Sequence, residues 1–135
     1  MEYPESVLAR FDAPPHAGPL APGSGTVVAG RAGGVAEGIE AVFQVRVADG
    51  RIVAAAFYAY GCPYSIAACS LTAERLVGLE VNALRDFGLL SLAPELELPV
   101  EKRGRLLLIE DALRSCWRAW DNRGLAASKE SRSDP

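Results

Sequence analysis

The clearest pattern in the chain is an alternation of apolar and polar residues over positions 39–47. Apolar side chains at every second position are typical of a strand that buries one of its faces. The predicted buried face carries Ile39, Ala41, Phe43, Val45 and Val47, and the opposite face carries Glu40, Gln44 and Arg46. This segment is therefore expected to form a half-buried strand.

Two further strands are predicted on either side of this segment. Asp49-Gly50 is a strong hairpin-turn signal, so residues 51–60 are expected to return as the partner strand. Residues 26–30 predict a first, edge-like strand, and the glycine-rich residues 31–38 that follow it predict a flexible loop. The first half of the chain should thus fold into three antiparallel strands.

Helical spacing of apolar residues replaces the alternation after residue 62. It extends over residues 63–77, and Gly78 is expected to stop the helix. Shorter helical pieces are predicted over residues 3–10 and 81–87. A last helix, expected to end at Gly124, has an apolar stripe formed by Leu106, Ile109, Leu113, Trp117 and Trp120. Strands followed by helices predict an α+β domain, with a three-stranded antiparallel sheet and helices packed on one face.

Length and composition favour one domain with neither a nucleic-acid nor a membrane partner. The chain has 135 residues, and we expect a single domain over residues 1–123 and a disordered polar tail over residues 124–135. A net charge of −3 argues against general binding to nucleic acid. No apolar run approaches the roughly 18 residues of a membrane span, and the acidic start does not resemble a secretory signal. A cytoplasmic protein is expected, whose three cysteines, an odd number, do not form a disulfide framework.

Cys62 lies where the third predicted strand meets the first long helix. The local sequence is Tyr60-Gly61-Cys62-Pro63, and proline suits the first helical position, so Cys62 is expected at the N-cap. There the helix dipole and the free backbone N–H groups favour the thiolate, the form that binds metal or attacks sulfur. The alternative is a small apolar residue that closes the strand.

Five short segments carry a resemblance to a known family, namely Tyr3-Pro4-Glu5-Ser6-Val7-Leu8, Asp49-Gly50-Arg51-Ile52, Tyr60-Gly61-Cys62, Ser65-Ile66-Ala67 and Glu110-Asp111-Ala112-Leu113. In this order they resemble the IscU/NifU N-terminal family of iron–sulfur cluster assembly scaffolds, over most of the chain. The resemblance implies an IscU/SufE-like fold and a non-enzymatic role in handling iron and sulfur. It also implies an iron–sulfur cluster, iron or zinc as the bound group and a cysteine desulfurase as partner.

The family's cluster site is only partly retained in this chain. The family holds its cluster with three cysteines, an aspartate and a histidine. In this chain the cysteine positions correspond to Glu37, Cys62 and Arg105, the aspartate position to Ile39 and the histidine position to Gly104. Cys62 alone keeps the family residue, Glu37 offers an oxygen ligand, and a guanidinium cannot ligate. A conventional cluster is therefore not expected, and Cys62 and Glu37 are the candidate metal ligands. We predict that Glu37 and Arg105 form an ion pair, and that Arg105 lowers the pKa of Cys62.

The remaining cysteines and the histidine are not expected to belong to the site, and the segment that resembles the family's chaperone-binding segment is changed. Cys69 and Cys116 lie within predicted helices and are expected to pack in the core. His16, the only histidine, stands in a proline-rich loop and is expected to be solvated. The family's chaperone-binding segment corresponds to Leu98-Pro99-Val100-Glu101-Lys102, where two interior positions differ and a negative charge has entered. These changes argue against recognition by the usual chaperone.

Three functions remain open from the sequence. The first is a divergent assembly scaffold that docks on a cysteine desulfurase and binds iron or a cluster weakly or across a dimer. The second is a single-cysteine sulfur acceptor, in which Cys62 carries a persulfide as in the SufE proteins, which resemble this family in fold. The third is a non-catalytic relative that keeps the fold and a partner-binding surface.

Overall fold

The structure of the protein is a computed structural model that describes residues 3–133, with side chains described for residues 3–123. Three strands precede three of the four α-helices. In chain order the elements are α1 (Glu5–Asp12), β1 (Thr26–Gly34), η1 (Val35–Glu37), β2 (Ile39–Ala48), β3 (Arg51–Tyr60), α2 (Pro63–Leu76), α3 (Ala83–Asp86), η2 (Leu89–Leu92), η3 (Val100–Lys102) and α4 (Gly104–Ser133). Among the helices of residues 3–133, none is both long and apolar enough to cross a membrane.

The three strands form one antiparallel sheet in the order β1-β2-β3. Phe43 in the central strand pairs with Gly30 on one side and with Phe57 on the other. The five alternating apolar residues of β2 are all at most 3% exposed, which confirms the predicted buried face. Asp49 and Gly50 both adopt positive φ, as a tight hairpin turn requires.

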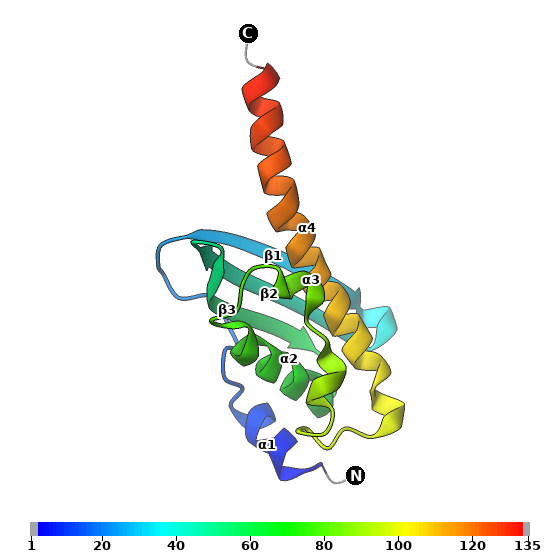
Figure 1. Ribbon diagram of the computed structural model, residues 1–135. Helices are drawn as coiled ribbons and strands as arrows, with labels where there is room; N and C mark the ends of the chain where they lie inside the picture. The colour runs from blue at the N-terminus through cyan, green and yellow to red at the C-terminus, as the bar shows by residue number, and fades with distance from the viewer. Residues whose placement is uncertain (1–2, 134–135) are drawn as a thin grey trace.

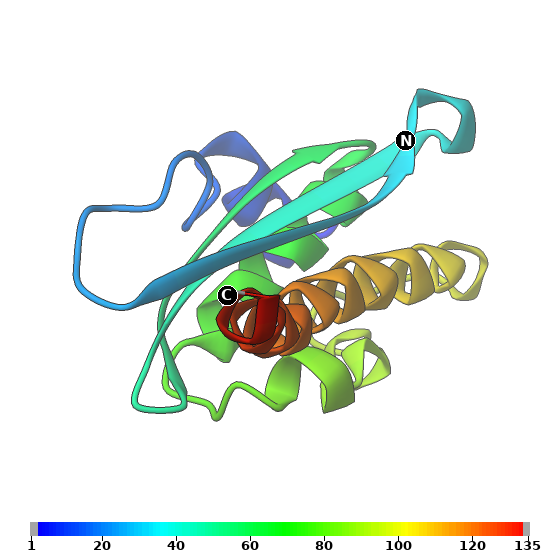
Figure 2. The same ribbon diagram turned by 90° about the horizontal axis from the view of Figure 1, so that it is seen from above.

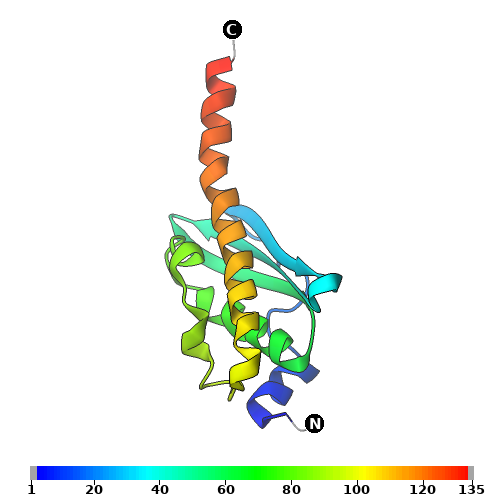
Figure 3. The same cartoon turned by 90° about the vertical axis from the view of Figure 1, so that its right-hand side faces the viewer.

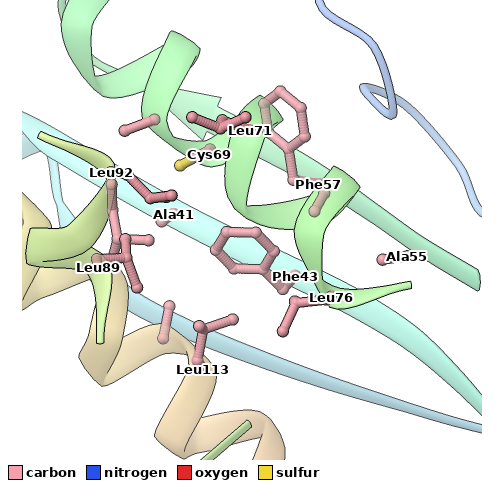
Figure 4. Close-up of a cluster of buried hydrophobic side chains, with 14 of the residues drawn as sticks. Ala41, Phe43, Ala55, Phe57, Cys69, Leu71, Leu76, Leu89, Leu92 and Leu113 are labelled. Carbon is pink, nitrogen blue, oxygen red and sulfur yellow. The ribbon is translucent and has the colours of Figure 1, made fainter. Parts of the chain in front are cut away.

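The helices pack on one face of this sheet, which confirms the predicted α+β fold (Figures 1, 2 and 3). Helix α4 crosses β1 and β2, α2 lies against β3, and α1 packs on α2. Between the layers, Phe43 and Phe57 meet apolar side chains of both long helices, including Leu71, Leu76 and Leu113 (Figure 4). Burial of these side chains is the main force that holds helices to sheet.

The glycine-rich stretch is more regular than predicted. The expected loop over residues 31–38 is wrong, because β1 continues to Gly34 and a 3₁₀ turn, η1, follows it. Pairing of Gly33 with Glu40 and of Gly34 with Ile39 completes the ladder to the start of β2. Residue 33 must be glycine because the backbone of Ile39 approaches it closely: a Cβ atom there would lie only 2.2 Å from the carbonyl oxygen of Ile39. The connection between β1 and β2 is thus short and holds η1 at the end of the sheet.

The last helix is longer than predicted. Its expected end at Gly124 is wrong, because the helical backbone continues to Ser133. One glycine in a helix costs only about 1 kcal/mol relative to alanine, so it ends a helix only when it also takes a capping conformation. Figure 1 shows the C-terminal part of α4 extending beyond the sheet. The domain boundary at residue 123 stays a prediction, and residues 134–135 lie outside the described residues.

The face of the sheet opposite the helices is partly covered by the segment before β1. Arg46 points to that face, as predicted, but it is 9% exposed and not solvated, which the alternation alone does not indicate. Its Nη1 donates a hydrogen bond to the carbonyl oxygen of Ala21 at 2.6 Å, and Gly23 and Gly25 lie against its side chain. The same proline-rich segment makes a parallel bridge to β3 between Ala17 and Phe57.

Candidate functional site

Cys62 stands at the start of α2, as the sequence predicts. Strand β3 ends at Tyr60, Gly61 turns the chain with a φ of 154°, and Cys62 is the N-cap residue with Pro63 at the first helical turn. The free N–H groups of that turn give the helix start a partial positive charge. The thiol is half-buried at the end of the sheet that also carries η1.

The surroundings of the Cys62 sulfur favour the thiolate. Burial by itself raises the pKa of this thiol, but the hydroxyl and the backbone N–H of Ser65, the charge of Arg105 and the N–H of Tyr64 together bring it below its ordinary value. The Ser65 Oγ atom lies 3.5 Å from the Cys62 Sγ atom. No side-chain cap hydrogen bond is formed, so the two backbone N–H groups act as nearby dipoles. The predicted effect of Arg105 is confirmed in its direction.

Four of the five positions taken from the family's cluster site line one open pocket of about 320 Å³, and the fifth, Cys62, is not among its lining residues. The lining residues are Glu37, Ile39, Glu101, Gly104, Arg105 and Leu108. The pocket therefore combines η1, the start of β2, η3 and the first turn of α4. A Cβ atom on Gly61 would lie 3.5 Å from Cγ1 of Ile39, so the segment that leads into Cys62 borders these residues.

Two features of this pocket differ from the sequence prediction. The Glu37–Arg105 ion pair is wrong: within residues 3–123 neither side chain takes part in an ion pair of 4.0 Å or less. The Glu37 carboxylate instead turns back over Gly34, with Oε2 3.2 Å from where a Cβ atom would stand. Glu101 was not predicted as a site residue, although its charge in the altered chaperone segment was a usable signal.

The remaining cysteines and the histidine do not join this site. Cys69 and Cys116 are fully buried, and burial raises the pKa of both thiols, in Cys116 to about 12. The Cys116 thiol donates to the carbonyl oxygen of Phe43 at 3.5 Å, which confirms its packing role. His16 is exposed, but it is also held to β3, because its Nδ1 lies 2.9 Å from the carbonyl oxygen of Ala55.

The donor set at this site does not fit a conventional cluster. Within the described side chains, no three His, Cys, Asp or Glu residues gather so that they could hold a metal ion. A cluster ordinarily needs four protein ligands, mostly thiolates. Here Cys62 is the one thiol of the described residues that is not fully buried, and the pocket next to its segment is lined by the carboxylates of Glu37 and Glu101 and the guanidinium of Arg105. The arrangement suits chemistry at a single thiolate better than chemistry at a ligand set.

Comparison with known proteins agrees with this fold. The family model described as the NifU-like N terminal domain matches residues 2–127. The chain is 32% identical to the iron-sulfur cluster assembly scaffold protein IscU of Rickettsia prowazekii, over 85% of this chain and 88% of that protein. It is 33% identical to the scaffold protein IscU of Escherichia coli K12, over 85% and 91%. The solved N-terminal NifU-like protein of Brucella abortus shares the fold, with a TM-score of 0.64 and 16% identity, over 88% of this chain and 94% of that one.

These matches define a class and then a family. The class is the α+β domains in which a three-stranded antiparallel sheet carries its helices on one face. Within that class, the chain belongs to the NifU-like N-terminal domain family, which includes the IscU scaffolds of iron–sulfur cluster assembly.

Proposed function

We propose that the protein handles sulfur in iron–sulfur cluster assembly, with Cys62 accepting sulfur as a persulfide from a cysteine desulfurase. The observation that carries this proposal is one half-buried thiol of lowered pKa at the N-terminus of α2, while the other two thiols are buried and have raised pKa values. Persulfide transfer needs one nucleophilic thiolate and no further ligand. The protein is in this view a carrier and does not turn over a small-molecule substrate.

The transfer balances without an added oxidant or reductant. The Cys62 thiolate attacks the terminal sulfur of the persulfide on the donor cysteine. A new S–S bond forms at Cys62 as the donor's S–S bond breaks, and the electron pair of that bond leaves with the donor as its thiolate. The proton on the terminal sulfur moves with that sulfur to Cys62. Arg105 and the first-turn amides of α2 favour the attacking thiolate.

A second candidate is weak binding of iron or of a cluster by Cys62 and Glu37, alone or across two copies of the chain. The observation in its favour is that Glu37 and Glu101 line the pocket beside the thiol, because carboxylate oxygens suit iron. Arg105 weighs against metal binding, since a positive charge that acts on Cys62 also repels a metal ion bound there. We also expect the usual chaperone not to bind at η3, where Glu101 has brought in a negative charge.

Intact-mass measurement after incubation with a cysteine desulfurase and cysteine tests the first candidate. We expect one added sulfur atom on the wild-type chain and none on Cys62→Ser, while Cys69→Ala serves as the matched control and still takes up sulfur. Sulfur uptake by Cys62→Ser would contradict the proposal.

Anaerobic reconstitution with iron and sulfide, followed by absorbance, tests the second candidate. Cluster absorbance that is lost in both Cys62→Ser and Glu37→Gln supports it. If neither sulfur nor iron is taken up, a non-catalytic partner-binding relative is the function that remains.

A further inference from the structure

The Ser65 hydroxyl has an unusual partner among the buried hydroxyls of this protein. Ser65 is 1% exposed, Ser70 is fully buried, and so is Thr72. Ser70 and Thr72 donate to backbone carbonyl oxygens at 2.8 Å and 2.7 Å. Within the described residues, the Ser65 hydroxyl instead has the Cys62 sulfur as its hydrogen-bond partner, at 3.5 Å. A buried hydroxyl rarely stays without a partner, so its proton is available to this sulfur.

Helix geometry keeps the two groups together. Cys62 is the N-cap and Ser65 is the third residue of α2, the two positions whose side chains bond backbone N–H groups in a capping box. Here no such side-chain cap bond forms, and the two side chains contact each other instead. Gly61 leaves room for the Ser65 side chain, because a Cβ atom at residue 61 would lie 3.0 Å from Cβ and 3.2 Å from Oγ of Ser65. The absence of a side chain at Gly61 therefore permits the contact between the hydroxyl and the sulfur.

From this geometry we infer that Ser65 is a positioning residue for the proposed sulfur transfer, whose hydroxyl donates to the Cys62 thiolate and sets its reactivity. A thiolate has no proton to donate, so Ser65 must be the donor in the reactive state. This inference rests on the proposed function, because it assumes that the Cys62 thiolate is the reacting group.

The inference predicts a crossing of two pH–rate curves. Loss of a hydrogen bond of typical net strength lowers the fraction of thiolate at pH 7 by about fivefold. The thiolate that remains is about twofold more nucleophilic, because intrinsic nucleophilicity rises as the pKa rises. At pH 7, Cys62 of the Ser65→Ala variant should therefore react about two- to threefold more slowly than Cys62 of the wild type. Near pH 10, where the thiolate fraction no longer limits the rate in either protein, Cys62 of the variant should react up to about twofold faster.

Alkylation of Cys62 by iodoacetamide, followed by peptide mass spectrometry from pH 6 to pH 10.5, measures these curves on the full chain. Ser70→Ala is the matched control, since it removes a buried hydroxyl of the same helix that does not contact Cys62. Ser65→Thr keeps the hydroxyl and should restore the wild-type curve. A purely structural role of Ser65 changes the rate in one direction at all pH values and does not make the curves cross.

The outcomes separate this inference from the proposed function. If the curves cross for Ser65→Ala alone, the role of Ser65 is supported. If wild-type Cys62 then takes up no sulfur from a desulfurase, the proposed function fails but the role of Ser65 in holding the thiolate stands. Curves of wild type and Ser65→Ala that coincide, or that run parallel, overturn the inference, whether or not sulfur is transferred.

Discussion

Gly30 is the position where a single added carbon should disturb the fold most. Helix α4 crosses β1 directly over this residue. A Cβ atom there would lie 2.2 Å from the backbone nitrogen of Cys116, 2.6 Å from the carbonyl oxygen of Ala112 and 2.7 Å from the carbonyl carbon of Ser115. All three are backbone atoms of one helix, so no side chain can rotate to relieve the contact. Gly30→Ala therefore forces α4 away from the sheet.

The size of the effect follows from that displacement. Ordinary contact begins near 3.4 Å, so α4 would have to move by about 1 Å along the line of contact. Such a movement loosens the packing of Ile109, Leu113 and Cys116 against the sheet, all of which are at most 1% exposed. Overpacking in cores typically costs about 1–3 kcal/mol, and a rigid backbone neighbour favours the upper end. We expect a loss of about 3 kcal/mol, or roughly 10 °C in Tm.

Urea unfolding followed by circular dichroism measures this loss. Gly88→Ala is the matched control, because a Cβ atom at Gly88 meets nothing within 4 Å and its φ is negative. We expect the control to stay within about 0.5 kcal/mol of wild type, as is usual for surface substitutions. A Gly30→Ala protein of wild-type stability would refute the argument that the α4 backbone is fixed against β1.

Two further predictions concern the thiols. Arg105→Gln removes a positive charge near Cys62, so it should raise the pKa of that thiol. Alkylation of Cys62 at pH 7 should then slow by about two- to fivefold at low ionic strength and by less in high salt. Unchanged pH–rate curves would contradict this prediction. Burial raises the pKa of the Cys116 thiol to about 12. The unfolded thiol ionises near pH 8.5, so the stability from the buried neutral thiol is fully present below about that pH and decreases above it, by about 1.4 kcal/mol per pH unit. Cys69 contributes a loss of its own, because burial raises the pKa of its thiol too. Urea unfolding at pH 8 and near pH 10 should therefore show a smaller loss in Cys116→Ala than in the wild type, and an equally large loss would rule out a contribution from Cys116.

The strands were predictable because their signals are local. The alternation over residues 39–47 and the turn at Asp49-Gly50 fix which side chains face the helices, and the structure reproduces both. The extension of β1 to Gly34 was missed, because glycine has low strand propensity and pairing with Ile39 decides its conformation. The end of α4 was missed for the related reason that Gly124 was read as a cap from its type alone.

The site was predictable in its location and less so in its contacts. Periodicity cannot bring residues 37, 39, 104 and 105 together; the family resemblance predicted this grouping, and the shared pocket confirms it. The direction of the Glu37 side chain depends on open space over Gly34, which no sequence pattern reports. Ser65 is different, because an N-cap cysteine followed three residues later by a serine is a pattern visible in the sequence. That spacing was the missed signal.

One residue links the family fold to the proposed chemistry. A cluster site needs several anionic ligands around metal cations, and a positive charge in its midst raises the free energy of the loaded state. The same charge lowers the free energy of a lone thiolate, and Arg105 lies close enough to Cys62 to do so. At the position of a family ligand, arginine therefore disfavours metal binding and favours nucleophilic sulfur by one electrostatic effect. The fold does not need to change for this to happen, because η1, the start of β2 and the start of α4 still line one pocket.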